Sequence, residues 1–271
     1  MMRSLWTAAS GMIAQQTNVD TISNNIANVN TTGYKSEKTE FKSLLYQTLQ
    51  ARTTTANGEQ KPIPAQVGLG TRVASTTSNY TNGSMLANDS DTAFALQGDG
   101  FFAVRGADGN TYYTRNGEFG WSIGTNGVTL TNSDGYQVLD TNGNAIVIPN
   151  NIKTSTVEVS KDGSFSVKNT DGTYTPLNMT IGVWQFNNPG GLNKRADSLL
   201  QVTAASGNPL NEATTNGLVR SSVNQHYLEG SNVQIADEMV NLIVAQRAYE
   251  MNSKAIQASD DMLSQANQLR R

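Results

Sequence analysis

The amino-acid sequence predicts an α+β protein. Long N- and C-terminal helices are expected to pair as a coiled-coil-like domain, and an extended connector joins them to a central antiparallel all-β domain. Three observations predict this class. Apolar residues recur every seven positions near the C-terminus, a three-four apolar stripe runs along the N-terminus, and tight-turn pairs fill the middle. We expect a discontinuous helical core domain (1–36 and 228–271), the connector (37–80 and 200–227) and an outer β domain (81–199).

The N-terminal segment predicts a helix that begins near Arg3 or Ser4. Its apolar residues recur at helical spacing: Leu5, Ala8, Met12, Val19, Ile22, Ile26 and Val29. Between Arg3 and Lys35 the only charged residue is Asp20, whereas the solvated face of an amphipathic helix normally carries several charges. We therefore expect this helix to contact protein on more than one side. It should end by Gly33, because glycine favours the left-handed conformation of a C-terminal cap.

The C-terminal segment predicts a longer helix. Ser231, with Gln234 three residues later, forms a capping-box pattern at its start, and the helical pattern continues nearly to Leu269. Its charges flank an uncharged run at 239–246, so we expect the middle of the helix to be enclosed. The apolar residues spaced by seven are Ile235, Leu242, Tyr249, Ile256 and Leu263. This spacing is typical of helices that pair along a seam.

Between the terminal helices the pattern changes to that of short strands. Nine Asn-Gly or Asp-Gly pairs lie between residues 82 and 172, and such pairs suit the positive φ angles of hairpin turns. The β-prone runs are 101–104, 112–114, 128–131, 145–148, 157–159, 164–167 and 180–186. We expect an antiparallel domain of roughly seven to ten short strands. The stretches 50–66 and 204–224 show no hydrophobic periodicity, so we expect the first to lie in the extended connector and the second in the segment by which the chain returns to the helices.

Composition excludes several functions. Only 15% of the residues are charged and the formal net charge is −3, which disfavours an electrostatic grip on nucleic acid or on an anionic membrane. The absence of cysteine excludes disulfides and thiolate chemistry. No stretch approaches the ~18 consecutive apolar residues that span a bilayer, and the N-terminus lacks the apolar run of a secretory signal. We therefore expect no nucleic-acid partner and no membrane span, and any export should need no cleaved leader.

Candidate catalytic and metal-binding residues are few. His226 is the single histidine, so it cannot by itself form a metal site or a catalytic triad, and we expect a surface or interface side chain. The glycines at 68–70 and 98–100 lack the spacing and the following Lys-Ser/Thr of a phosphate loop. The segment 140–151 lacks the Gly and Glu that a calcium loop requires at its sixth and twelfth positions. We expect no enzyme activity, no catalytic residue, no cofactor and no metal.

Competing hypotheses remain open on these residues. The apolar stripes are also consistent with ordinary core packing of a helix against its own domain. A cell-wall carbohydrate-binding or hydrolysing protein would need converging carboxylates or an aromatic platform, and the candidates for the platform are Trp121, Tyr112 and Tyr113. The carboxylate pairs at 89/91 and 260/261 are expected to be solvated. A phage-tail-like or adhesin-type fibre built on the same heptads is a third hypothesis.

Several segments resemble one known family. Residues 23–35, Ser-Asn-Asn-Ile-Ala-Asn-Val-Asn-Thr-Thr-Gly-Tyr-Lys, preceded by Ser10-Gly11-Met12, resemble the N-terminal signature of bacterial flagellar axial proteins, which form the rod and hook. Residues 228–233, 239–256 and 261–263 resemble the C-terminal helix of that family, and patches at 97–102, 113–119 and 188–192 also match. Within the family, the segments 41–48 and 66–70 are most similar to the distal rod subunit.

The resemblance implies a structural role. Terminal helices of many copies would pack into a tube around an export channel, and the β domain would face outward. The chain would be a distal rod subunit of the basal body, polymerising helically into a hollow drive shaft that transmits torque to the hook, with a hook or proximal-rod subunit as the alternative. The implied partners are further copies of the chain, adjacent rod and hook proteins, bushing or ring proteins and peptidoglycan around the rod, and the flagellar type III export apparatus. The implied location is the extracytoplasmic basal body, in the periplasm and cell wall.

We predict that both helices supply the assembly interface. A helix with polar uncharged faces and an apolar seam contacts its partner helix on one side and neighbouring subunits on the others. Repetition of one contact that never closes into a ring generates a helical filament. The predicted interface residues are Leu5, Met12, Val19, Ile22, Asn25, Ile26, Asn28, Val29, Ile235, Met239, Leu242, Ile243, Tyr249, Ile256 and Leu263. Gly33 and Ser231 are predicted as hinge or cap residues.

Overall fold

The computed structural model describes residues 2–50, 65–124, 127–169 and 171–268. Within these residues the contacts divide the chain into two compact units. The helical unit lies within residues 1–27, 37–78 and 234–271, and the β unit within residues 28–36 and 79–233. The chain is therefore of the predicted α+β class. Both units are discontinuous in sequence, so each is completed by segments that are distant along the chain.

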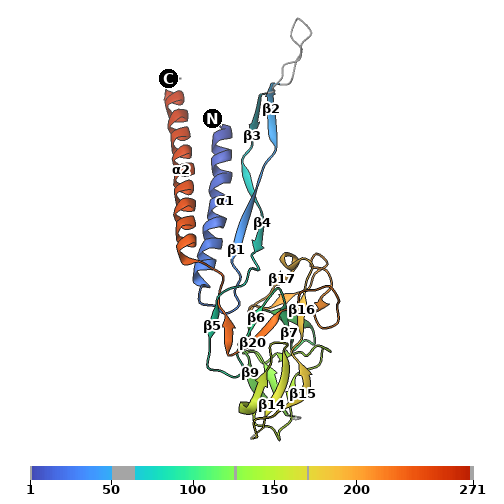
Figure 1. Cartoon of the computed structure of the whole chain (residues 1–271). Coiled ribbons are helices and arrows are strands. Elements are labelled where there is room, and N and C mark those ends of the chain that lie inside the picture. The colour runs from blue at the N-terminus through green and yellow to red at the C-terminus, as the bar shows by residue number, and fades with distance from the viewer. Residues whose placement is uncertain (1, 51–64, 125–126, 170, 269–271) are drawn as a thin grey trace. The chain divides into compact units, whose positions relative to one another are not determined.

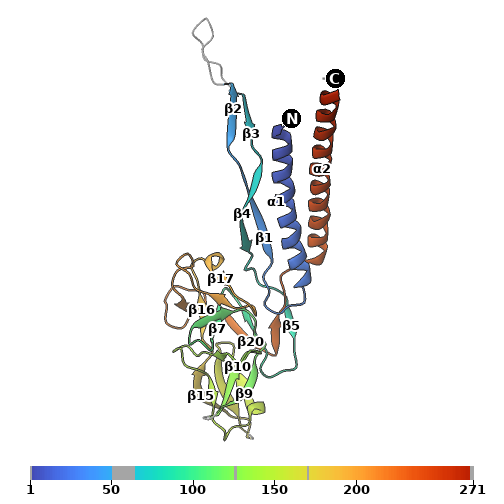
Figure 2. The ribbon, with the colours of Figure 1, turned by 180° about the vertical axis from the view of Figure 1, so that it is seen from behind.

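Two helices and a long ribbon form the helical unit. Helix α1 (Met2–Ala27) and helix α2 (Ile235–Gln268) lie side by side and run antiparallel (Figure 1). Strand β1 (Glu37–Ser43) pairs with β4 (Thr71–Ser78), and β2 (Tyr46–Gln50) pairs with β3 (Ala65–Gly68). The view from behind shows α1 between α2 and this ribbon (Figure 2). The expectation that α1 contacts protein on more than one side is confirmed.

The ribbon differs from the connector that the sequence predicts across residues 37–80. The described residues there are extended, but they form paired strands that pack on α1. The pairing was not predictable from alternation, because Thr39 is the only buried residue of β1 and the other side chains are partly or fully exposed. A ribbon without a buried face carries no period-two hydrophobic signal. Residues 51–64 of the predicted connector lie outside the described residues.

The β unit consists of short antiparallel strands, as predicted, but thirteen of the described strands lie within residues 81–199, where we expected roughly seven to ten, because several have only two or three residues and carry no sequence period. The strands are β5 (Met85–Ala87), β6 (Phe94–Gln97), β7 (Phe101–Arg105), β8 (Thr111–Thr114), β9 (Gly120–Gly124), β10 (Gly127–Thr131), β11 (Gln137–Val138), β12 (Val147–Ile148), β13 (Val157–Val159), β14 (Ser164–Lys168), β15 (Tyr174–Thr180), β16 (Val183–Gln185), β17 (Asn193–Lys194), β18 (Leu200–Gln201), β19 (Leu210–Asn211), β20 (Ser222–Gln225) and β21 (Tyr227–Glu229). Two short 3-10 helices lie at Thr154–Thr156 and Pro189–Gly191. Each of the predicted β-prone runs contains at least part of a strand.

Strand β7 lies at the centre of the β unit and is buried on both faces. It pairs with β8, β11 and β16 in a sheet to which ten of the described strands belong. Phe102 and Val104 pack into one apolar cluster, and Phe101 and Ala103 pack into a second. Alternate residues of one strand therefore supply two cores, which is the period-two pattern of a pleated strand.

Residues 200–227, which the sequence predicts to be a return connector, belong to the β unit. Strand β20 pairs with β6 through the whole of its length, and β21 pairs with β5. Val223 of β20 is buried in the same cluster as Phe94 and Leu96 of β6. The sequence did not reveal this pairing, because each strand has only three or four residues and is flanked by Ser, Asn and Gly residues that are typical of loops.

A buried ionic cluster joins three distant segments of the β unit. Lys35, Arg115 and Glu229 are 5%, 1% and 2% exposed. Lys35 Nζ lies 2.6 Å from Glu229 Oε1, and Arg115 Nη1 lies 3.3 Å from Glu229 Oε2. The Gly83 N–H also donates to Glu229 Oε1, and the Arg115 guanidinium stacks over the Phe101 ring. Burial lowers the pKa of Lys35, because desolvation disfavours the ammonium form more than Glu229 favours it.

Tyr113 makes the second apolar cluster sensitive to alkali. Its ring packs edge-on against Trp184 and Phe186, and burial raises its pKa from 10.0 to about 12. Between these two values the unfolded chain loses the phenol proton and the folded chain keeps it, so stability falls as pH rises, by up to about 1.4 kcal/mol per pH unit. We expect Tyr113→Phe to flatten this part of the pH profile. Urea unfolding of both proteins at a series of alkaline pH values measures the difference, and parallel profiles would contradict the assignment.

Candidate assembly interface

The two helices meet along a seam with a repeat of seven. Ser4 Oγ lies 3.1 Å from Ser259 Oγ, and Asn25 Nδ2 donates to Glu238 Oε1 at 3.3 Å. Between these contacts, Gly11 faces Asn252 so closely that a Cβ built on the glycine would lie 2.8 Å from Asn252 Nδ2. From one contact to the next, the residue number increases by seven or fourteen on α1 and decreases by the same amount on α2. The antiparallel pairing therefore keeps one register along its length.

The centre of this seam is lined by small and polar residues, and in this register Asn18 stands opposite the buried Ala245. Small side chains bring two helix axes close together, and hydroxyl and amide groups satisfy one another across the contact. The apolar heptad residues flank this centre. Leu242, Ile256 and Leu263 are half-buried, whereas Ile235 and Tyr249 are exposed.

The predicted residues of the N-terminal segment divide into two groups. Ile22 and Asn25 are buried, and Leu5, Met12, Val19 and Ile26 are half-buried within the helical unit. The remaining two, at 28 and 29, follow the end of α1 at Ala27 and belong to the β unit. The structure therefore does not bring those two together with the others on one helix face.

Both predicted caps need correction. Helix α1 ends at Ala27, six residues before Gly33, so Gly33 is not its C-cap. Gly33 does have a positive φ of 68°, and its N–H donates to the carbonyl of Glu229. Helix α2 begins at Ile235, and its first turn is closed by the Glu238 N–H bond to the carbonyl of Gln234. Ser231 instead accepts a bond from the Val233 N–H and orders the turn before the helix.

Helix α2 presents an apolar outer face, which we define as Met239, Val240, Ile243, Val244 and Met251. All five side chains are exposed. At about 100° per residue, this face lies opposite the seam residues Leu242, Ala245 and Asn252. Met239 and Ile243 were among the predicted interface residues. The heptad pattern missed the other three, which lie off its positions, although the uncharged run at 239–246 marks the region.

Helix α1 also exposes large apolar side chains that the stripe did not include. Trp6 is 75% exposed and Ile13 is 67% exposed. They are seven residues apart and so lie on one face of the helix. Isolated exposed apolar residues are normal in soluble proteins, but two side chains of this size on one face mark a candidate interface.

Asn25 anchors α1 to both of its neighbours. Its side chain is 1% exposed, donates to the Glu37 carbonyl at 2.8 Å, and accepts from the Glu37 N–H at 2.9 Å. The same amide donates to Glu238 of α2. This arrangement extends the backbone pairing of β1 onto the helix.

Replacement of Asn25 by Ala is expected to destabilise the helical unit by about 2 kcal/mol, because the Glu37 N–H and carbonyl lose buried partners. Hydrogen exchange at the Glu37 amide measures the effect. Ser23→Ala, at an exposed position of the same helix, is the control and should leave protection unchanged. Equal exchange in both variants would show that Asn25 does not hold the strand.

The structure does not assemble the aromatic platform that a carbohydrate site would need. Tyr113 is buried in the core, and the Tyr112 hydroxyl donates to Asp108 at 2.7 Å. Trp121 packs partly buried against the other apolar cluster. Neither α1 nor α2, as far as the described residues extend, has an apolar stretch long enough to cross a bilayer.

Comparison with known proteins gives the family. Residues 5–35 match the model described as "Flagella basal body rod protein", residues 95–175 match "Flagellar hook protein FlgE/F/G D1 domain", and residues 224–269 match "Flagellar basal body rod FlgEFG protein C-terminal". The flagellar basal-body rod protein FlgG of Borreliella burgdorferi is 44% identical over the whole of both chains. FlgG of Caulobacter vibrioides is 42% identical over 99% of this chain and all of its own, and FlgG of Bacillus subtilis is 35% identical over both full lengths. The chain therefore belongs to the bacterial flagellar rod and hook protein family, and within that family it resembles the FlgG rod proteins.

Proposed function

We propose that the chain is a structural subunit of the distal rod of the flagellar basal body. Many copies would polymerise helically into a hollow shaft that transmits torque to the hook. The observation that carries the proposal is the distribution of side chains on the helix pair. Small and polar residues meet in the seam between α1 and α2, whereas the apolar outer face of α2 and Trp6 of α1 are exposed.

This distribution favours assembly over a self-sufficient monomer. Apolar surface left in water is the main source of association free energy, and exposed apolar side chains grouped on one side of a helix, here around the exposed Arg247, are typical of a protein interface. We propose that α1 and α2 pair in a coiled-coil-like manner through the register described above, and that neighbouring copies cover the outer faces. The predicted residues Leu242, Ile256 and Leu263 would then support the pairing, while Met239 and Ile243 contact other copies.

The family supports the proposed surroundings. Its members are named as rod and hook proteins, so adjacent rod and hook subunits are the proposed axial partners. Ring or bushing proteins and peptidoglycan would surround the shaft outside the cytoplasm, and the type III apparatus would export the chain. A hook or proximal-rod subunit of the same family is the alternative.

Two measurements test the proposal. Purified protein, imaged by electron microscopy over a concentration series with isolated basal bodies as nuclei, should form helical tubes, whereas a closed oligomer or a monomer throughout would overturn it. In a flagellated bacterium that lacks its own FlgG, a tagged copy should lie between the proximal rod and the hook. A tagged copy distributed along the hook would instead support the hook alternative.

A further inference from the structure

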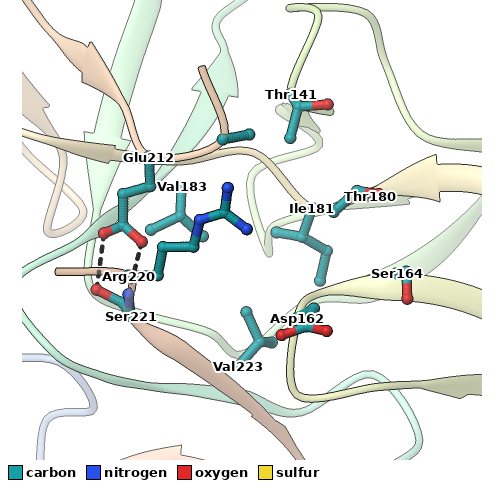
Figure 3. A pocket seen from close by; sticks show the side chains of 11 residues that line it. Thr141, Asp162, Ser164, Thr180, Ile181, Val183, Glu212, Arg220, Ser221 and Val223 are labelled. Carbon is teal, nitrogen blue, oxygen red and sulfur yellow. Dashed lines mark hydrogen bonds between the residues drawn. The ribbon is translucent and has the colours of Figure 1, made fainter. Parts of the chain in front are cut away.

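A cavity of about 420 Å³ lies in the β unit, beside the segment that leads into β20 (Figure 3). Its apolar lining comes from Ile181, Val183 and Val223, which are all buried. Thr141, Ser164 and Thr180 also line it. Most of the lining residues are polar or charged, so a ligand here would be held mainly by polar contacts, in a space whose size is within the range of binding sites.

A buried carboxylate fixes one wall of the cavity. Glu212 is 5% exposed. Its Oε2 accepts a bond from the Ser221 N–H at 2.6 Å, and its Oε1 accepts from Ser221 Oγ and Gln185 Nε2 at 2.7 and 2.8 Å. Ser221 Oγ in turn accepts from the Gly100 N–H. These four bonds hold the backbone at residue 221 and so position the residue before it.

The residue positioned in this way is Arg220, whose side chain extends into the cavity (Figure 3). Among the described residues, no hydrogen bond or ion pair occupies its guanidinium, and the same is true of the Asp162 carboxylate across the cavity. Glu212 forms no ion pair with Arg220, because its hydrogen bonds are directed to Ser221 and Gln185. Arg220 and Asp162 are both exposed, so one solvated cation and one solvated anion line the same cavity without a partner among the described residues.

The charges select the chemistry of a ligand. A guanidinium fork matches a carboxylate or a phosphate. With Asp162 and Glu212 lining the same cavity, a doubly charged phosphate would meet two carboxylates for one cation, so a singly charged carboxylate is favoured. The exposed Asp162 carboxylate can accept a hydrogen bond from a donor close to that ligand carboxylate. An acidic residue of a polypeptide supplies both, as a side-chain carboxylate and a backbone N–H.

We infer that this cavity binds an acidic residue of a polypeptide, with the carboxylate on Arg220 and the neighbouring N–H on Asp162. In the polymer the residue would come from a second copy of the chain, a part of the inference that rests on the proposed function. The β unit offers suitable groups, because its Asp-Gly turns carry exposed aspartates such as Asp134. Copies would then be linked laterally through their β units, independently of the helices.

A capped aspartate tests the site without any polymer. N-acetyl-aspartate N-methylamide is titrated into the full-length protein, and the probe is followed by NMR at the Ser221 and Val223 amides and at the Arg220 side chain. We expect the aspartate probe to bind the parent protein saturably. Binding should be at least about tenfold weaker when the asparagine analogue replaces the probe, and when Arg220→Gln replaces the parent protein. Arg105→Gln, which removes another exposed arginine of the β unit, is the matched control and should bind as the parent does. Equal binding of the two probes, unchanged binding by Arg220→Gln, or no binding at millimolar concentrations would overturn the site.

A second measurement tests the source of the carboxylate. Polymers of Arg220→Gln should dissociate at a lower salt concentration than polymers of the parent or of Arg105→Gln, because a lateral ion pair is missing. If the peptide probe binds but the polymers are equally resistant to salt, the site stands and a second copy is excluded as its source. If the parent forms no polymer at all, the proposed function fails while the result with the peptide probe remains valid.

Discussion

Replacement of Glu229 by Gln is expected to lower the free energy of unfolding of the β unit by about 3–5 kcal/mol, the typical cost of removing one partner from a buried ion pair. Among the described residues, Glu229 is the anion that forms ion pairs with both Lys35 and Arg115, whereas the exposed Asp99 acts on Lys35 only through a weaker charge interaction. The neutral amide would leave two buried cations without a buried counter-ion, and its NH₂ group would face one of them. Urea unfolding followed by tryptophan fluorescence measures the change, because Trp121 and Trp184 both lie in the β unit.

The matched control is Glu158→Gln, which breaks the ion pair between Glu158 and Lys168. These side chains are 44% and 52% exposed, so water screens the pair and the loss should stay below about 1 kcal/mol. A double-mutant cycle with Lys35→Met isolates the coupling between Lys35 and Glu229. Losses of similar size in the two Gln variants, together with a coupling near zero, would show that burial does not strengthen the cluster.

The position of the cluster explains why its effect should extend beyond one contact. Lys35 lies two residues before Glu37, where the chain re-enters the helical unit, and Glu229 lies five residues before Gln234, where the chain re-enters that unit one residue ahead of α2. Gly33 donates to the Glu229 carbonyl, and Asn232 accepts from the Ser36 N–H. The two segments that lead to the helices are therefore held to each other inside the β unit, by charges and backbone bonds that no local sequence pattern displays.

Local chemistry allowed much of the fold to be predicted from the sequence. The helices were evident from three-four and seven-residue spacing, and the β unit from turn pairs. Five of the predicted turn glycines, at 109, 135, 143, 163 and 172, have φ between 74° and 82°. The ribbon of β1 to β4 was missed because its exposed strands have no apolar face.

The candidate interface was predicted only in part, and the reason is physical. Spacing of seven identifies the side of α2 that faces its partner, but it does not reveal that serine, glycine and asparagine occupy the closest contacts. Ser4 and Gly11 are seven residues apart, as are Asn252 and Ser259. A search for apolar residues at this spacing does not detect the repeat, because these four residues are small or polar. The outer face was predicted only at Met239 and Ile243, because apolar residues that point away from a seam match no intramolecular pattern. Its function follows only when a second copy is considered.

Replacement of Ile243 by Asp is expected to prevent polymerisation while leaving the monomer folded. Ile243 is 55% exposed and lies on the outer face of α2, so a carboxylate there remains solvated in the free chain. In the polymer the same carboxylate would be buried against apolar groups of a neighbouring copy, at a cost of several kcal/mol. We expect the concentration needed for polymerisation to rise at least a hundredfold, which corresponds to about 2.7 kcal/mol. Sedimentation of polymers over a concentration series measures it, and urea unfolding confirms that the monomer is intact.

Two control variants separate a defect in assembly from a general effect of charge or of helix stability. Asn267→Asp places the same carboxylate at an exposed position of α2 that, at about 100° per residue, does not lie on the side of the outer face, and it should polymerise as the parent does. Leu242→Asp puts the charge beside the seam, where Leu242 is half-buried, so it should weaken the pairing of α1 with α2 as well as assembly. If Ile243→Asp polymerised normally, the outer face would not contact neighbouring copies. If instead it unfolded the helical unit as Leu242→Asp does, Ile243 would belong to the intramolecular contact, and the interface would have to be sought around Trp6 and Ile13.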